Sequence, residues 1–288
     1  MAVQLFRVQY DEIEPYRQFC NGLGVQPPLV DWKQIPPVPA VAFKRWSLTR
    51  CREEEAAICF LSSGTGSGER SRHYMDAGAL HLYRASLEHG YSRFVEGGNP
   101  MPICSLIDPW SDAPDSSLAY MVSTLIETRP AVEIAAQEPF VLFGTAVALY
   151  RMDAVKLSNG SKIVETGGFK STDIEIDRRA FYDQLSERFG TNDIISEYGM
   201  SEMASQCYAG PSNLFRNPPW LKTRVIDPIS LTEVGLGEMG ILTHYDLANW
   251  NSVLAIRTED AAIRRENGFE LVGRAAQAEP RGCSYRFA

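Results

Sequence analysis

The chain alternates between two patterns of apolar residues, one with the period of a strand and one with the period of a helix. Between residues 56 and 196, short apolar runs are separated by segments in which apolar residues recur three or four positions apart. The runs that predict strands are 56–61, 101–107, 139–143, 161–165 and 192–196. The segments that predict helices begin at Asp76, Ser116 and Asp177. Strands that alternate with helices predict a mostly parallel sheet flanked by helices, and hence an α/β fold.

Two of the predicted helices carry signals for where they begin and end. Asp76 and Asp177 are typical N-cap residues, because a short side-chain oxygen accepts a hydrogen bond from a free backbone N–H of the first turn. Gly90 and Gly190 follow the last periodic positions, where glycine commonly ends a helix. We therefore expect both helices to end at these glycines.

The pattern differs toward both ends of the chain. Residues 1–54 predict a helical lead-in followed by a proline-rich connector, because prolines such as Pro36 and Pro37 favour extended backbone. After about residue 222 the pattern predicts short strands with tight turns, at 238–244, 253–258, 261–265 and 270–272. Asn267-Gly268, between the last two, predicts a β-hairpin with a type I′ turn.

Composition and charge narrow the possible partners. The net charge of −8 and the lack of a basic cluster argue against nucleic acid or an anionic membrane as a partner. The longest apolar run, 139–149, is interrupted by Gly144 and is far shorter than the ~18 residues of a membrane span. The N-terminus does not resemble a signal peptide, and the six cysteines are scattered without a Cys-x-x-Cys pair. We therefore expect a cytoplasmic protein without a structural zinc site.

A loop rich in glycine and hydroxyl side chains follows the first predicted strand of the α/β region, at residues 62–70. Its small residues are Ser62, Ser63, Gly64, Thr65, Gly66, Ser67 and Gly68. Such a loop suits a phosphate group, because its backbone N–H groups can be approached closely. A Walker P-loop and a dinucleotide-binding fingerprint both require glycine where Glu69 stands, so neither motif fits. A surface turn without a ligand is the alternative.

The loop is the first of five segments that occur in a recognisable order. The others are Gly167-Gly168-Phe169-Lys170, Tyr198-Gly199-Met200-Ser201-Glu202, Thr258-Glu259-Asp260 and Gly273-Arg274. This order resembles the adenylate-forming superfamily, which includes acyl-CoA synthetases and peptide-synthetase adenylation domains. Segments 35–44, 165–170 and 281–284 resemble its LuxE branch, the acyl-protein synthetases.

The resemblance covers about residues 35–288 and implies an architecture. The expected fold is the large domain of adenylate-forming enzymes, with a mostly parallel sheet and a C-terminal antiparallel β subdomain. We divide the chain into a lead-in at 1–54, a nucleotide-binding α/β core at 55–221, and a β subdomain with a C-terminal tail at 222–288.

The resemblance also implies a role for each motif, with ATP and Mg²⁺ as cofactors. The 62–70 loop, with Thr65 at its centre, would hold the β- and γ-phosphates. The remaining implied contacts are Gly167, Gly168 and Tyr198 with adenine, Ser201 with the α-phosphate, Glu202 with Mg²⁺, Asp260 with the ribose hydroxyls, and Gly199 and Arg274 with the nucleotide. Lys170 is either a solvated surface lysine or a cation that balances the adenylate phosphate. Gly66 and Glu69 depart from the superfamily pattern, which usually has threonine and proline at these positions.

The last fourteen residues carry the feature that resembles the LuxE branch most closely. They are too few for the small domain that most of the superfamily carries after Gly273-Arg274. LuxE proteins similarly end soon after an Arg-Gly-Cys motif whose cysteine receives the acyl group, which implies that role for Cys283. A thiolate attacks a mixed anhydride far more readily than a hydroxyl does.

The resemblance therefore implies that a carboxylic acid, expected to be a fatty acid, becomes acyl-AMP and that its acyl group is then transferred to Cys283. A fatty-acid reductase would be the partner that accepts the acyl group. One alternative is an adenylating enzyme that passes the acyl group to CoA or a carrier protein. Another is a non-catalytic nucleotide-binding scaffold, which the departures at Gly66 and Glu69 favour. The sequence indicates neither which acid is activated nor the oligomeric state.

Overall fold

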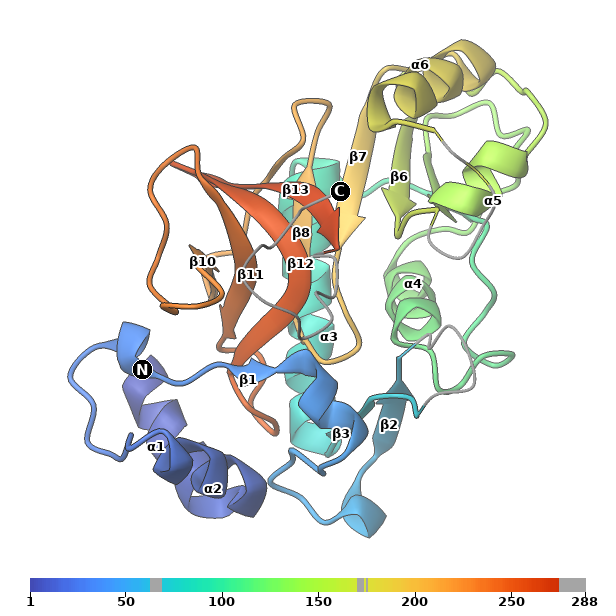
Figure 1. Cartoon of the computed structure of the whole chain (residues 1–288). Coiled ribbons are helices and arrows are strands. Elements are labelled where there is room, and N and C mark those ends of the chain that lie inside the picture. The colour runs from blue at the N-terminus through green and yellow to red at the C-terminus, as the bar shows by residue number, and fades with distance from the viewer. Residues whose placement is uncertain (63–68, 170–173, 175, 275–288) are drawn as a thin grey trace.

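Two large β-sheets and the helices beside them organise the chain (Figure 1). The computed structural model describes residues 1–62, 69–169, 174 and 176–274. The first sheet has the order β4-β5-β6-β7-β8. Its strands are β4 Ile103–Ser105, β5 Val141–Thr145, β6 Lys162–Thr166, β7 Ile194–Tyr198 and β8 Cys207–Ala209. The first four strands run parallel and β8 is antiparallel, which confirms the predicted α/β fold.

Helices cover both faces of the mostly parallel sheet. They are α3 Ala77–Tyr91, α4 Ser117–Thr128, α5 Ala146–Arg151 and α6 Arg178–Phe189. Along β5, Val141 and Phe143 pack in the cluster formed with α3 and α4, whereas Leu142 packs with α5 and α6. In Figure 1, α5 and α6 lie on the outer side of β6 and β7, away from the second sheet. Because both faces are covered, consecutive residues of β5, such as Val141, Leu142 and Phe143, are all apolar and buried rather than alternating.

The predicted helix starts are confirmed. The side chains of Asp76, Ser116 and Asp177 each accept a hydrogen bond from the backbone N–H three residues later. Gly190 ends α6 with φ of 76°, a left-handed conformation that suits glycine.

The predicted end of α3 at Gly90 is wrong. The helix runs to Tyr91 and continues as a π-helical turn, Ser92–Glu96, before Gly97. Glu96 ends this turn with a buried carboxylate that binds Arg129 at 2.6 Å and the backbone N–H of Met101 at 3.0 Å. This contact with a distant residue explains why the helix does not end at Gly90.

The second sheet is mostly antiparallel and has the order β10-β11-β12-β13-β9, with β1 beside β12. Its strands are β1 Val38–Pro39, β9 Leu214–Phe215, β10 Leu221–Ile226, β11 Met239–Asp246, β12 Ala255–Arg265 and β13 Gly268–Arg274. The segments predicted as separate strands at 253–258 and 261–265 are one strand, β12, with an irregular register at Ala261 and Ala262.

The hairpin predicted between β12 and β13 is present, but its predicted type I′ turn is wrong. Arg265 pairs with Gly268, so the two loop residues are Glu266 and Asn267. A type I′ turn needs positive φ at both, and neither residue has it. A glutamate at the first position disfavours that conformation.

The lead-in packs on the antiparallel sheet. Helices α1 Ala2–Glu12 and α2 Glu14–Gly22 place Phe6 and Tyr16 in the same apolar cluster as Leu242 and Leu254. Short helical turns follow, at η1 Trp32–Gln34, η2 Ala40–Lys44 and η3 Glu53–Glu55. The segment then forms an antiparallel hairpin, β2 Ile58–Leu61 with β3 Arg72–Met75. Within the described ranges, the helices are too short or too polar to cross a membrane.

Candidate functional site

The motif residues gather where four parts of the fold meet. These are the carboxyl ends of β6 and β7, the end of the β2–β3 hairpin that carries the glycine-rich loop, the loop after β7, and the β12–β13 pair. Open α/β folds bind ligands at the carboxyl ends of their strands. The site is built from residues far apart in the sequence, and each contact is described below.

The base of the glycine-rich loop is fixed by backbone and hydroxyl hydrogen bonds. The Ser62 N–H donates to the Ser71 carbonyl at 3.0 Å, and Ser62 Oγ accepts from the Ser71 N–H at 2.9 Å. Ser62 and Ser71 therefore hold the two ends of the loop side by side. Ser63, Gly64, Thr65, Gly66 and Ser67, predicted to hold phosphate, lie outside the described residues.

Arg70 braces this base. Its Nε donates to the Ser62 carbonyl at 2.6 Å, and one terminal nitrogen donates to the Leu61 carbonyl at 3.3 Å. The other terminal nitrogen forms an ion pair with Asp115 at 2.6 Å. The guanidinium is thus already engaged by two carbonyls and a carboxylate, which is a structural use of the basic residue in this motif.

Glu202 is a buried carboxylate near the loop base. It is only 5% exposed. Burial raises the pKa of Glu202, while the nearby Ser71 hydroxyl and the positive charges of Lys44 and Arg274 act in the opposite direction. A nearby cation would stabilise the ionised form of such a buried carboxylate.

One carboxylate is enough for the cation that the fold implies. Mg²⁺ is commonly held by one or two protein carboxylates together with substrate phosphates and water. Among the described residues no group of three His, Cys, Asp or Glu side chains is arranged to hold a metal by itself. Glu202 beside a candidate phosphate loop therefore fits Mg²⁺ bound together with ATP.

Three side chains from different elements hold the backbone around Glu202. His73 Nδ1 is 2.6 Å from the Ser201 carbonyl oxygen, and Asn249 Nδ2 donates to the Glu202 carbonyl at 3.0 Å. Asp246 accepts from the Ala204 N–H at 3.0 Å and from the Ser205 hydroxyl at 2.7 Å. All three side chains are almost fully buried, so water does not compete for these hydrogen bonds.

Burial changes the protonation of two of these groups. It lowers the pKa of His73 to about 4, so the imidazole is neutral near pH 7. It raises the pKa of Asp246 to about 6, against the effect of the hydrogen bonds from Ser205, Ala204 and Ala248.

The Ser201 hydroxyl lies close to the end of β2 that leads into the glycine-rich loop. Its Oγ is 3.3 Å from Ser117 Oγ and 3.5 Å from the Leu61 carbonyl oxygen. The hydroxyl predicted to contact the α-phosphate therefore lies next to the strand that leads into the glycine-rich loop. The structure brings Ser62, Ser201 and Glu202 together.

Tyr198 and Asp260 form a second pair. The Tyr198 hydroxyl donates to Asp260 Oδ2 at 2.8 Å, so β7 and β12 are joined at the site. The tyrosine ring is 9% exposed and packs with the rings of Phe215, Phe269 and His244. Burial and the neighbouring Asp260 charge raise the pKa of Tyr198 well above its ordinary value.

Arg274 lies opposite Asp260 in the register of β12 and β13. Its side chain is exposed and lies 3.9 Å from Glu259. It is therefore held only loosely by protein groups and lies close enough to Glu202 to influence that carboxylate.

The glycines of the motifs differ in their surroundings. A Cβ on Gly167 or Gly168, just after β6, would meet nothing within 4 Å, so the strand end borders open space. A Cβ on Gly199 would instead lie 2.8 Å from Glu197 Oε1. The described residues therefore leave the backbone at Gly167-Gly168 uncrowded, while a side chain at position 199 would crowd the carboxylate of Glu197. Lys170 and Cys283 lie outside the described residues.

Several residues of the site were not predicted from the sequence. They are Ser71, His73, Asp246, Asn249 and the buried carboxylates Glu165 and Glu197. Burial raises the pKa of Glu197 to about 7, and Thr166 donates a hydrogen bond to it. A glutamate inside a strand with an apolar pattern is a visible signal, because charged residues are rarely buried there without a reason. His73, Asp246 and Asn249 carry no comparable signal.

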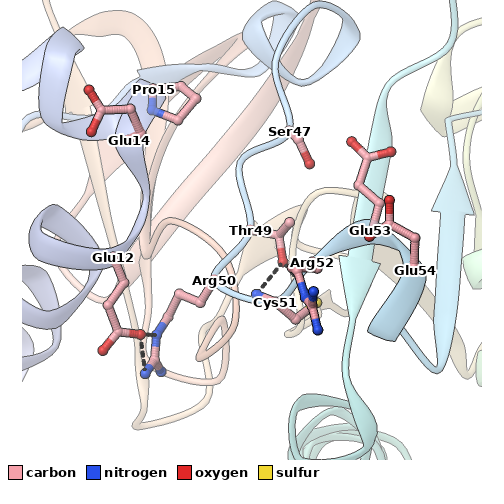
Figure 2. A pocket seen from close by; sticks show the side chains of 10 residues that line it. All are labelled: Glu12, Glu14, Pro15, Ser47, Thr49, Arg50, Cys51, Arg52, Glu53 and Glu54. Carbon is pink, nitrogen blue, oxygen red and sulfur yellow. Dashed lines mark hydrogen bonds and ion pairs between the residues drawn. The ribbon is translucent and has the colours of Figure 1, made fainter.

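A hollow of about 400 Å³ lies elsewhere, between the lead-in helices and residues 47–54 (Figure 2). Its charged groups are partly paired, with Arg50 2.7 Å from Glu12 and Arg52 in an ion pair with Glu55. The residues that line it are Glu12, Glu14, Pro15, Ser47, Thr49, Arg50, Cys51, Arg52, Glu53 and Glu54. None of the predicted site residues is among them.

Comparison with known families gives one match. The profile described as "Acyl-protein synthetase, LuxE" matches residues 106–288, more than half of the chain. A long-chain-fatty-acid–luciferin-component ligase of Vibrio harveyi is 24% identical, over 97% of this chain and 84% of that protein. The corresponding ligase of Aliivibrio fischeri is 22% identical, over 91% of this chain and 78% of that protein.

Solved structures share the fold. A 2-hydroxyisobutyryl-CoA ligase in complex with its acyl-AMP has a TM-score of 0.70 at 13% identity, covering 95% of this chain and 67% of its own. ATP-bound MatB from Rhodopseudomonas palustris has a TM-score of 0.57 at 15% identity, covering 78% of this chain. That match spans 49% of the MatB chain, so the shared fold is about half of MatB. The architecture is therefore that of adenylate-forming enzymes, as expected.

Proposed function

We propose that this chain, which belongs to the LuxE family of acyl-protein synthetases, converts a long-chain fatty acid to acyl-AMP with Mg·ATP and transfers the acyl group to Cys283. The observation that carries the first step is the position of Glu202, a buried carboxylate directly after Ser201, whose Oγ lies 3.5 Å from the Leu61 carbonyl oxygen. This position sets a carboxylate at the base of a loop whose composition suits phosphate. The printed names of the two bacterial ligases support the fatty-acid substrate.

In the first step, a carboxylate oxygen of the acid attacks the α-phosphorus of ATP. The bond from that phosphorus to the bridging oxygen breaks, and pyrophosphate leaves. Mg²⁺, when bound, would neutralise charge that develops on the phosphates. Glu202 would hold the ion, Ser201 would donate to the α-phosphate, and Asp260 with Arg274 would orient the ribose and its phosphates. Catalysis is then mostly electrostatic and positional.

In the second step, the Cys283 thiolate attacks the acyl carbonyl carbon. The bond from that carbon to the phosphate oxygen breaks, AMP leaves, and a thioester forms on the protein. The support for Cys283 is the Arg-Gly-Cys sequence at 281–283, which resembles the LuxE motif. A fatty-acid reductase is the partner we propose for the thioester.

Intact-protein mass spectrometry tests both steps. The protein is incubated with Mg·ATP and a series of fatty and aryl acids, and pyrophosphate is measured in the same samples. We expect an ATP-dependent acyl adduct that hydroxylamine removes. Cys283→Ser should keep pyrophosphate release and lose the adduct.

The other outcomes identify the alternatives. Pyrophosphate release without an adduct, with turnover on added CoA or carrier protein, would replace Cys283 with an external thiol. ATP binding without pyrophosphate release from any acid would indicate a nucleotide-binding scaffold, for which the exposed Glu69 would be the first residue to examine.

A further inference from the structure

We propose that His73 is a positioning residue that fixes the Ser201–Glu202 segment against the β2–β3 hairpin and thereby sets the affinity for Mg·ATP. The inference rests on the proposed function, because Mg·ATP is the ligand that Glu202 would hold. It assigns a role in the site to a residue that belongs to none of the five motifs. The hairpin carries the glycine-rich loop, so His73 would link the loop to the carboxylate.

The hydrogen bond itself is short and its direction is fixed. His73 Nδ1 lies 2.6 Å from the Ser201 carbonyl oxygen. A carbonyl oxygen only accepts hydrogen bonds, so the imidazole donates through Nδ1–H. The ring is 2% exposed, and the hydrogen bond is therefore shielded from water.

Packing holds the imidazole in place. His73 is paired with Phe60 in the β2–β3 register, and its ring contacts the ring of Phe43 edge-on at 6.0 Å between centroids. Phe43 is itself fully buried in η2. The imidazole that donates the hydrogen bond is therefore fixed, because its backbone belongs to a strand and its ring packs against a buried aromatic neighbour.

The hairpin reaches the segment mainly through this hydrogen bond. Asn249 and Asp246, which hold the following residues, belong to β11 and the loop after it and not to the hairpin. The remaining described contact between hairpin and segment is Ser201 Oγ with the Leu61 carbonyl, at 3.5 Å. Without His73 Nδ1–H, the segment would keep only this longer hydrogen bond to the hairpin among those described.

A matched pair of substitutions separates the hydrogen bond from packing. His73→Asn keeps an N–H donor at the same number of bonds from Cα as Nδ1, and His73→Leu has nearly the same shape as asparagine without the donor. Loss of a buried hydrogen bond of this kind corresponds to roughly a tenfold change in an equilibrium constant. We expect His73→Leu to bind Mg·ATP about tenfold more weakly, and His73→Asn to bind within about threefold of wild type.

Calorimetric titration of ATP at several Mg²⁺ concentrations measures this affinity. Hydrogen exchange of residues 199–206 in the ligand-free protein gives a second, ligand-independent measurement. Exchange there should be faster in His73→Leu and close to wild type in His73→Asn. Tyr74→Phe is the control, since it removes a hydrogen bond of the same strand that goes to Glu53 and not to the segment. It should change neither measurement.

The two proposals fail in different ways. If wild type binds no Mg·ATP, the proposed function fails, and hydrogen exchange alone then decides whether His73 fixes the segment. If folded His73→Leu matches wild type in binding and in exchange, the positioning role is refuted. If His73→Asn is as impaired as His73→Leu, the imidazole serves packing only, which also refutes it. Should His73→Leu not fold, His73→Phe, which keeps an aromatic ring beside Phe43, takes its place with the same expected results.

Discussion

Replacing Glu197 with glutamine should remove much of the pH dependence of stability between pH 5 and pH 8. Glu197 lies on β7 directly before Tyr198 and is 6% exposed. Burial raises its pKa from 4.5 to about 7, and the charge of Glu165 adds to this, while the hydrogen bond from Thr166 opposes it. The folded protein therefore keeps a proton on this side chain at a pH where the unfolded chain has released it.

The sign and size of the effect follow from this difference. Below pH 4.5 the carboxyl group is protonated in both states, so its contribution to stability is fully present. As the pH rises toward 7, the unfolded state ionises first, and the stability falls until the folded state ionises as well. A pKa of about 7 against 4.5 corresponds to about 3 kcal/mol in the free energy of unfolding. Glutamine has no proton to lose, so its variant should not show this fall.

Urea unfolding followed by tryptophan fluorescence at pH 5, 6, 7 and 8 measures the free energy of unfolding of both proteins. The difference between Glu197→Gln and wild type should grow by about 2.5 kcal/mol in favour of glutamine across this range, because the unfolded state is already partly ionised at pH 5. Glu54→Gln, at an exposed glutamate, is the matched control and should follow wild type. A constant difference between Glu197→Gln and wild type from pH 5 to pH 8 would refute the reasoning.

Two further predictions concern the ligands. Glu202→Gln removes the charge proposed to hold Mg²⁺, so pyrophosphate release should fall by about 100-fold or more. Wild-type release in that variant would exclude Glu202 as the metal ligand, and Glu266→Gln, at an exposed glutamate in the β12–β13 turn, is its control. Gly168→Val adds a side chain into open space, so it should leave the melting temperature nearly unchanged. The same change should weaken ATP binding measured by calorimetry, and unchanged binding would place the adenine elsewhere.

The parts of the fold that depend on neighbouring residues could be predicted from the sequence. Asp177 begins α6 and Gly190 ends it, because the N-cap oxygen and the left-handed glycine act within a few residues. The end of α3 could not be predicted in this way. It depends on Glu96 and Arg129, which are 33 residues apart and meet only in the folded chain. Local signals point to Gly90, and the distant ion pair overrides them.

The same distinction between local signals and long-range contacts holds for the candidate site. The motifs at 198–202 and 258–260 could be found because their order resembles a known superfamily, and the structure joins Tyr198 to Asp260. The residues that hold Glu202 in place could not be found, because no local pattern marks them. His73 lies 128 residues from Ser201, and Asn249 lies 47 residues from Glu202. Their role is visible only in the contacts.

The support of Glu202 extends to the first helix of the chain. Asn249 holds the Glu202 carbonyl, and the carbonyl of Asn249 accepts a hydrogen bond from Gln9 Nε2 at 3.0 Å. Gln9 Oε1 in turn accepts from the Leu254 N–H at 2.9 Å, and the side chain is completely buried. A buried amide that satisfies two backbone groups of one loop restricts that loop, because losing either bond leaves a polar group without a partner. The lead-in thus contributes to the geometry of the site, although none of its residues belongs to the five motifs that we assign to the nucleotide.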